Sequence, residues 1–275
     1  MLLSHSKFEI LKNEIKECGD WAKEKQSSLS VRYKEDKSPV TEVDMTISHK
    51  IIALIKELFP ECAIISEEEI TENKENAPYT FVLDPIDGTD MYSQGLPSFC
   101  IALGILDSTF NPVGAIIYAP RFGKATDKGL FLSLYPGEKP FINGKELELE
   151  SSKSEIYQIT LSSSLVKHID FTNYEGKIRM FGSQILQIVA PLIFMNISCS
   201  ISEPCYIWDY SASHAVIKSL GYDLYKPNLE PFTYSESFLK RNRAECVLYG
   251  GEKSNVEKLI HLCPLRNSNE RIIHY

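Results

Sequence analysis

The segment Asp84-Pro85-Ile86-Asp87-Gly88-Thr89 constrains the fold of this chain more than any other, because it places two carboxylates directly after a strand-like run. That run, Tyr79 to Leu83, is rich in aromatic and β-branched residues and predicts a buried strand. Carboxylates at the end of a buried strand are costly without a partner, and Mg²⁺ prefers oxygen ligands. Gly88 permits a sharp turn, where backbone N–H groups can hold a phosphate. The segment therefore predicts a cation or phosphate site at a strand end.

Two other interpretations of this segment need no cation. In the first, the segment is a plain β-turn in which Asp84 caps the chain, since short motifs have real false-positive rates. In the second, it is the nucleophile motif Asp-x-Asp-Gly-Thr of haloacid-dehalogenase phosphatases. Here Pro85 and Ile86 separate the two aspartates, so the second carboxylate is misplaced and we reject this interpretation.

Two more acidic positions can contribute to the same site. Glu67, within Ser66-Glu67-Glu68-Glu69, follows the apolar run Ala63-Ile64-Ile65, so we expect it at another strand end. Asp209 follows a tryptophan and opens an expected helix. Taken alone, Asp209 is better explained as a helix N-cap than as a ligand.

The composition is acidic, with 37 Asp or Glu against 29 Lys or Arg and a formal net charge of −8. Nucleic-acid-binding chains usually show a basic footprint, so we expect no nucleic acid polymer as a partner.

No run approaches the ~18 apolar residues of a membrane span. Lys7 and Glu9 interrupt the start where a signal peptide needs apolar residues. The seven cysteines are scattered and odd in number, which favours reduced thiols. We therefore expect no membrane partner and a cytoplasmic location.

Hydrophobic periodicity predicts an alternating order of elements and two halves. Helices are expected over residues 8–22 and 47–58, joined by an extended stretch that ends at Asp36 to Asp44. Strands are expected at 62–65, 79–83, 99–106, 113–118 and 129–134, with a hairpin turn at Asn143-Gly144. Later come a strand near 156–162, a helix from about 183, a strand near 197–202 and a helix over about 209–220. A polar stretch, Glu146 to Glu155, suggests a boundary between an α+β half, residues 1–147, and an α/β half, residues 148–275.

Together these segments resemble the inositol monophosphatase superfamily, which includes inositol monophosphatases, 3′(2′),5′-bisphosphate nucleotidases and, more distantly, fructose-1,6-bisphosphatases. The matching segments, in order, are Ser38 to Asp44, Ser66-Glu67-Glu68, Leu83 to Thr89, Gly95-Leu96-Pro97, Tyr118-Ala119-Pro120, Asn143-Gly144, Gly182-Ser183 and Ile207-Trp208-Asp209. The resemblance implies an α+β / α/β layered sandwich (α-β-α-β-α) of the sugar-phosphatase type. It also implies a lithium-sensitive phosphomonoesterase that uses two or three Mg²⁺ ions per site on a small phosphorylated metabolite, and a possible homodimer.

The resemblance also assigns roles residue by residue. The implied metal ligands are Glu67, Asp84, the Ile86 carbonyl, Asp87 and Asp209. Asp44 matches an outer carboxylate that reaches a further metal through water, and Thr89 with Glu67 matches the pair that polarises the attacking water, so the implied catalytic residues are Glu67, Thr89 and Asp44. The implied substrate contacts are Asp87, Gly88, Thr89, Asp90, Gly182, Ser183, Gln184 and Asp209.

Departures from the family pattern concern the substrate and leave the implied ligands intact. Asp90 adds a negative charge beside the expected phosphate site, and Leu186 stands where nucleotidase-like members often carry lysine. The segment Tyr234 to Leu239 resembles bisphosphate nucleotidases, whereas Gly95-Leu96-Pro97 resembles inositol monophosphatases. We favour a bisphosphate nucleotide as substrate, with inositol 1-phosphate as the alternative. A metal-binding, catalytically weak regulatory relative is the alternative of another class, supported by Asp90.

Overall fold

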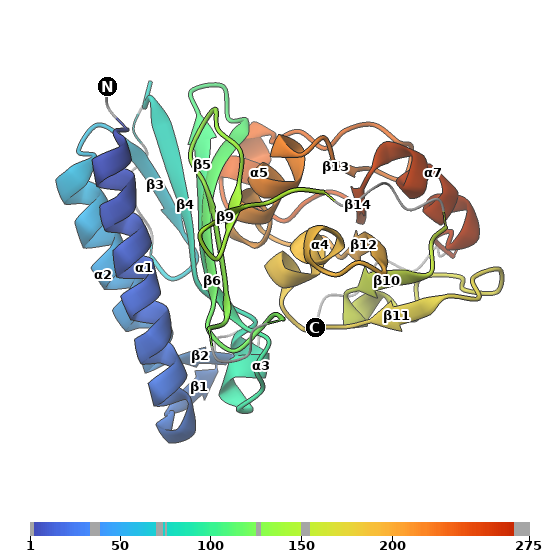
Figure 1. The fold of residues 1–275 in the computed structure, drawn as a ribbon, viewed down its shortest axis with the longest axis horizontal. Coiled ribbons are helices and arrows are strands. Elements are labelled where there is room, and N and C mark those ends of the chain that lie inside the picture. The colour runs from blue at the N-terminus through green and yellow to red at the C-terminus, as the bar shows by residue number, and fades with distance from the viewer. Residues whose placement is uncertain are drawn as a thin grey trace.

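Five layers make up the molecule in the computed structural model, which describes residues 3–33, 39–69, 74, 76–124, 128–149 and 155–266. A pair of helices, a seven-stranded sheet, a second pair of helices, a five-stranded sheet and a last helix follow one another across the molecule (Figure 1). The expected α-β-α-β-α sandwich is therefore confirmed. None of the described helices is both long and apolar enough to cross a membrane.

The elements have the following bounds. The helices are α1 His5–Lys25, α2 Glu42–Leu58, α3 Thr89–Ser93, α4 Gln184–Ile193, α5 Ser211–Ser219, α6 Glu236–Leu239 and α7 Lys253–Leu262, with 3₁₀ turns at Gln26–Ser28, Ser163–Leu165 and Ile207–Asp209. The strands are β1 Val31–Tyr33, β2 Pro39–Thr41, β3 Ala63–Ser66, β4 Tyr79–Asp87, β5 Cys100–Asp107, β6 Pro112–Ala119, β7 Leu130–Leu134, β8 Phe141–Ile142, β9 Lys145–Glu146, β10 Gln158–Leu161, β11 Lys177–Arg179, β12 Ile197–Ser202, β13 Asp223–Tyr225 and β14 Leu248–Gly251.

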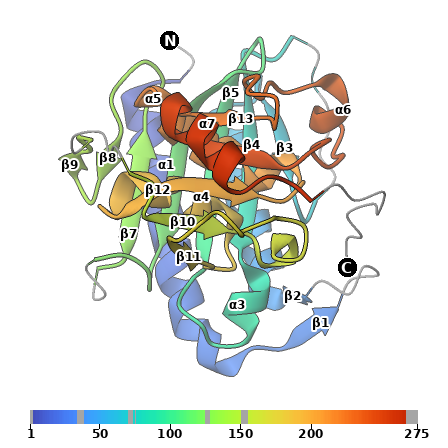
Figure 2. The same ribbon diagram turned by 90° about the vertical axis from the view of Figure 1, so that its right-hand side faces the viewer.

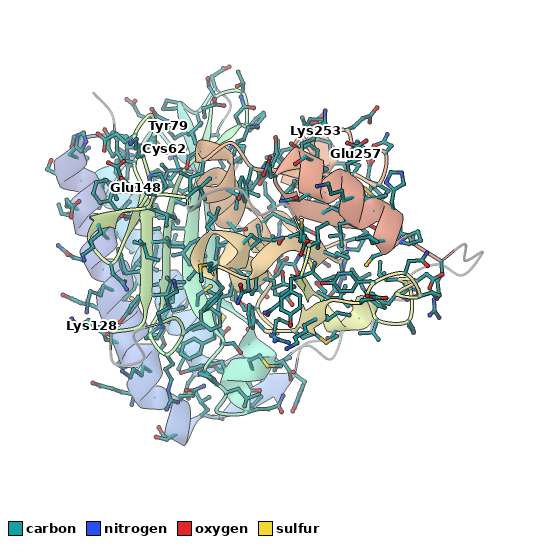
Figure 3. The ribbon with its side chains drawn as sticks, turned by 45° about the vertical axis from the view of Figure 1, so that its right-hand side comes forward. Cys62, Tyr79, Lys128, Glu148, Lys253 and Glu257 are labelled. Atoms are coloured by element: carbon teal, nitrogen blue, oxygen red, sulfur yellow. The ribbon has the colours of Figure 1, made fainter. Side chains whose placement is uncertain are left out.

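The first sheet runs in the order β3-β4-β5-β6-β7-β8-β9 and is covered on one face by α1 and α2. Leu11 and Ile15 of α1 and Ile51 of α2 pack with alternate residues of β4 and β5, as their helical spacing predicts. Cys62 and Tyr79 lie together where the parallel strands β3 and β4 begin (Figure 3). The carboxylates lie at the opposite ends of these strands.

The start of α2 corrects one expectation. The stretch up to Asp44 was expected to be extended, but α2 begins at Glu42, because Thr41 and Asp44 form a capping box. Asp44 therefore belongs to the first turn of a helix. Residues 36–38 of the same stretch lie outside the described residues.

A β-bulge in β4 gives Asp84 and Asp87 a common direction. In a regular strand, residues three apart point to opposite faces of the sheet. Here Asp84 pairs with Ala102 and Asp87 pairs with Cys100, so β4 carries one residue more than β5 over this span. Both carboxylates consequently face the same side as Ala102 and Cys100, which is the side covered by α4 and α5.

The second sheet has the order β11-β10-β12-β14-β13 and lies between α4 and α5 on one side and α7 on the other. Figure 2 shows α7 in front of this sheet. Lys253 and Glu257 lie on the outer surface of α7 (Figure 3), while Val256 and Leu259 are buried against the strands. The helix expected at about 209–220 is divided into a 3₁₀ turn and α5.

The two sheets draw on different parts of the sequence. The first uses residues 63–146 and the second uses residues 158–251. Residues 150–154 of the expected boundary lie outside the described residues. The division into two domains at 147 and 148 stays a prediction. The terms first half and second half denote the chain up to β9 and the chain from β10 onward.

Candidate active site

Three carboxylates gather where the two halves meet. One oxygen from each of Asp84, Asp87 and Asp209 lies within 4.8 Å of the others. Asp84 and Asp87 come from the end of β4, and Asp209 comes from the 3₁₀ turn before α5. The structure thus brings together residues that are more than 120 positions apart in the sequence.

Asp84 fits a cation best. The residue is 1% exposed, and its Oδ1 has no hydrogen-bond partner among the described residues. Burial, followed by the charges of Glu67 and Asp87, raises the pKa of Asp84 well above its usual range. An unpartnered buried oxygen among like charges is costly, and a divalent ion with oxygen ligands would remove that cost. The donor set is that of a hard cation such as Mg²⁺.

Asp87 connects the first half to the start of α4. Its Oδ2 accepts a hydrogen bond from the Ile185 N–H at 2.8 Å, its Oδ1 accepts one from the Gln184 N–H at 3.2 Å, and the Ser183 hydroxyl donates to Oδ2. An anion at a helix N-terminus is favoured by the unpaired N–H groups there. Burial nevertheless raises the pKa of Asp87 to about 6, against these hydrogen bonds.

Asp209 has a local role as well as a place in the cluster. Its Oδ2 accepts a hydrogen bond from the Tyr206 N–H at 2.8 Å, so it caps the 3₁₀ turn from the third position rather than from the N-cap. Burial, followed by the charges of Asp87 and Glu67, raises the pKa of Asp209 well above its usual range. The N-cap prediction for Asp209 is therefore wrong, although its carboxylate does accept a capping hydrogen bond. Because a carboxylate has two oxygens, the same side chain can also serve as a metal ligand.

Asp44 and Thr89 are joined directly. The Thr89 Oγ1 lies 2.8 Å from the Ile86 carbonyl oxygen and 3.2 Å from Asp44 Oδ1, and its single proton can serve either acceptor. Asp44 Oδ2 accepts a hydrogen bond from the Thr41 N–H at 2.9 Å. Burial raises the pKa of Asp44, although the hydrogen bonds from Thr41 oppose this shift.

Glu67 lies at the rim of the site. It falls outside the tight group of three carboxylates, yet its charge raises the pKa of both Asp84 and Asp209. Its N–H donates to the Leu83 carbonyl at 3.2 Å, which places it beside the end of β4. Glu67 is therefore close enough to act on the cluster electrostatically.

The expected substrate loop contacts the turn after β4. A Cβ on Gly88, whose φ is +87°, would lie 2.9 Å from the Ser98 carbonyl oxygen and 3.3 Å from that of Gly182, so only glycine fits. Gln184 is 8% exposed and its Nε2 has no hydrogen-bond partner among the described residues. Asp90 is exposed, and its Oδ2 accepts a hydrogen bond from Gln94 Nε2 at 3.1 Å.

Sequence reasoning missed two residues that contact the site. Cys100 lies opposite Asp87 across the bulge, and its Sγ is 3.7 Å from Asp87 Oδ2. Thr41 holds Asp44 through the capping box. The Thr-x-x-Asp spacing at 41–44 is a capping signal that could have revealed the second contact, whereas nothing in the sequence marks Cys100.

Comparison with known proteins agrees with this geometry. The sequence model of the Inositol monophosphatase family matches residues 8–261. The 3′(2′),5′-bisphosphate nucleotidase CysQ of Aggregatibacter actinomycetemcomitans is 26% identical over 228 residues, covering 79% of this chain and 83% of that protein. Inositol monophosphatase 1 of Solanum lycopersicum is 25% identical over 210 residues, covering 70% and 74%.

Solved structures show the same fold. An inositol monophosphatase family protein from Staphylococcus aureus MSSA476 superposes with a TM-score of 0.75 at 17% identity, covering 98% of both chains. The inositol monophosphatase of Thermotoga maritima gives a TM-score of 0.74 at 18% identity, covering 93% of this chain and 97% of that one. The chain therefore belongs to the inositol monophosphatase family and is a metal-dependent phosphomonoesterase.

Proposed function

We propose that Asp84, Asp87 and Asp209, with Glu67 at the rim, hold Mg²⁺ ions with which this enzyme hydrolyses a small phosphate ester, preferably a 3′(2′),5′-bisphosphate nucleotide. The observation that carries the proposal is the cluster formed by the carboxylates of Asp84, Asp87 and Asp209, in which Asp84 Oδ1 has no hydrogen-bond partner among the described residues. The Ile86 carbonyl is proposed as a further ligand. Its oxygen accepts from Thr89 and keeps a second lone pair.

The protein's own groups can orient and deprotonate the attacking water. When bound, the ions supply positive charge that neutralises the phosphate and favours ionisation of water at neutral pH. When Thr89 directs its proton to Asp44 Oδ1, its oxygen is free to accept a hydrogen bond from water. Glu67, at the rim of the same cluster, is proposed to accept a hydrogen bond from the second O–H of that water, which keeps this proton during attack. The raised pKa of Asp44 suits it to hold a proton from Thr89 during attack.

Residues around the turn after β4 are proposed to bind the substrate. The backbone N–H groups of Gly88 and Thr89, at the turn between β4 and α3, are proposed to contact the phosphate. The unpartnered Gln184 Nε2 supports a hydrogen bond to a polar group of the leaving alcohol. Ser183 acts by holding Asp87 at the start of α4. Asp90 is exposed beside this turn, and of the proposed substrate contacts it is expected to contribute least to substrate affinity.

The choice between nucleotide and inositol substrates rests on family likeness. CysQ of A. actinomycetemcomitans, a bisphosphate nucleotidase, matches more of this chain than tomato inositol monophosphatase 1 does, 79% against 70%. Inositol 1-phosphate is the second candidate, because Gly95-Leu96-Pro97 resembles inositol monophosphatases. Both candidates share the metal site and differ in contacts outside it.

The test is a phosphate-release assay with Mg²⁺ and with chelator, using 3′-phosphoadenosine 5′-phosphate, inositol 1-phosphate and fructose 1,6-bisphosphate. We expect Mg²⁺-dependent release, fastest from the nucleotide and inhibited by lithium. Asp87→Asn should lose several orders of magnitude in turnover while staying folded, which circular dichroism can verify.

Two results would redirect the proposal. Mg²⁺-dependent release that is fastest from inositol 1-phosphate would replace the substrate and keep the site. Tight Mn²⁺ binding with no release from any of the three esters would favour the weakly catalytic regulatory relative.

A further inference from the structure

Arg241 crosses from the second half of the chain to the loop that carries Glu67. It follows α6, which lies on the side of the molecule where β3 is the edge strand (Figure 2). Its Nη1 donates to the carbonyl oxygens of Ser66 at 2.6 Å and Glu69 at 2.8 Å, and its Nη2 donates to that of Glu67 at 2.7 Å. One guanidinium therefore holds three carbonyls of a single loop.

The same guanidinium also contacts the segment that carries Asp209. The Arg241 guanidinium carbon lies 4.9 Å from the centre of the Trp208 ring. Trp208 stacks on Tyr206 with ring centres 4.8 Å apart and planes inclined by 15°, and Arg243 lies 5.0 Å from the Tyr206 ring. Two arginines from the loop after α6 thus contact the two stacked aromatic rings of the turn that ends at Asp209.

We propose that Arg241 is a positioning residue that fixes the Glu67 loop against Trp208 and Asp209, and so sets the affinity of the site for its metal ions. This inference rests on the proposed roles of Glu67 and Asp209. Glu67 belongs to the first half and Asp209 to the second, so their separation depends on contacts between halves. A planar guanidinium can bridge three carbonyls and stack on an aromatic ring together, which an ammonium group cannot do.

The backbone of Arg241 supports a specific role. Its φ of +66° lies in the left-handed region, which is unfavourable for a long side chain. The surrounding contacts must offset this local cost. The loop carbonyls and the Trp208 face are the contacts that the structure provides.

The principal test is Arg241→Asn, because asparagine tolerates the left-handed backbone and cannot reach the loop. Mn²⁺ binding to the metal-free variant, measured by titration calorimetry, should weaken about 10- to 100-fold. The Mg²⁺ concentration for half-maximal activity should rise by a similar factor. Arg241→Lys should recover only part of the affinity, since the lysine ammonium keeps the charge and three N–H donors but lacks the planar fork that reaches three carbonyls while stacking on Trp208.

A matched control is available at the neighbouring position. Lys240 is paired with the exposed Glu236 at 2.7 Å, so Lys240→Asn removes one positive charge from the same surface without touching the Glu67 loop. This control should bind Mn²⁺ as the wild type does. An equal loss in Lys240→Asn would show that general charge is responsible, and would overturn the proposal.

A double-mutant cycle separates positioning from structural support. If Arg241 acts through Glu67, Arg241→Asn should weaken Mn²⁺ binding much less in a Glu67→Gln background than in the wild type. An undiminished effect there, or a lowered Tm with wild-type Mn²⁺ affinity, contradicts the proposal. Should Arg241→Asn fail to fold, wild-type affinity in Arg241→Lys would contradict it equally. Wild-type Mn²⁺ binding by both Asp84→Asn and Glu67→Gln would instead refute the proposed metal site itself.

Discussion

The two halves supply their carboxylates to the site in different ways. Asp84 lies within a strand that is hydrogen-bonded on both sides, and its Oδ1 has no partner among the described residues. Asp209 lies in a short 3₁₀ turn, where it is bonded to the Tyr206 N–H and followed by α5. Asp84 of the first half thus has a carboxylate oxygen without a hydrogen-bond partner among the described residues, whereas Asp209 of the second half is hydrogen-bonded to the backbone of its own turn. Changes in the two halves should therefore affect activity, metal affinity and stability in different proportions.

The largest expected effect is that of Asp84→Asn. It removes the least compensated charge of the cluster, so turnover with Mg²⁺ should fall by about a thousandfold or more, as when a main transition-state stabiliser is lost. The metal-free variant should be at least as stable as the metal-free wild type, because a buried repulsion has been removed. Phosphate release and chemical denaturation in chelator measure the two effects.

Asp209→Ala is the contrasting variant in the second half. It should lose activity and also destabilise the metal-free protein by about 1 kcal/mol, because the Tyr206 N–H loses its acceptor. Equal stability losses in Asp84→Asn and Asp209→Ala would remove the distinction between the halves.

The next effect is a pH dependence of metal binding. Burial raises the pKa of Asp87 to about 6 from 3.8, so the metal-free folded state keeps this proton where the unfolded state has lost it. The protonated Asp87 therefore stabilises the metal-free fold fully below pH 3.8, and this stability is lost as the pH rises through about 6. A bound cation requires the carboxylate, so the Mg²⁺-induced rise in Tm should be larger at about pH 7.5 than at about pH 5. An equal rise at both values would contradict this assignment of Asp87.

A smaller effect, on stability alone, is expected from His214→Gln in the second half. His214 is fully buried, and its Nε2 lies 2.6 Å from Asp223 Oδ1. Burial lowers the pKa of His214, and the hydrogen bond with Asp223 opposes this shift. The neutral imidazole therefore contributes to folding stability at neutral pH, and this stability is lost as the pH falls below 6.5 and the unfolded state takes up a proton first. The variant should lose about 1–3 kcal/mol of stability and keep wild-type Mn²⁺ affinity. Reduced Mn²⁺ affinity would place this pair within the functional site.

The smallest effect is that of Asp90→Asn. Asp90 is exposed, so its charge acts through water and should be worth less than about 1 kcal/mol. KM should fall about twofold at low salt, with kcat unchanged. A large gain in kcat would instead mean that Asp90 suppresses activity, as in a regulatory relative.

Part of the site could be predicted because its signals are local. Asp84 and Asp87 follow a strand that its composition reveals, and family likeness supplies Asp209. The bulge at Pro85 and Ile86 could not be predicted from spacing, although it decides that both carboxylates face α4 and α5. A single extra residue in a strand turns the following side chains to the other face of the sheet. Where that residue lies depends on the pairing with β5, which cannot be read from the local sequence of β4.

The second half was less predictable for the same reason. The segment that forms β14 contains two glycines among four residues, so it has a weak strand signal and becomes a strand between β12 and β13. Arg241 stands in a polar loop that suggests an ordinary exposed residue. Its three carbonyl partners lie more than 170 positions away, and only the tertiary structure brings them within reach.

The most direct test of a metal site shared by both halves is a crystal grown with Mn²⁺, with the ions located by anomalous scattering. We expect a strong peak bounded by carboxylate oxygens of Asp84, Asp87 and Asp209. A crystal with fully ionised, well-ordered carboxylates and no Mn²⁺ peak between Asp84 and Asp209 would contradict the account.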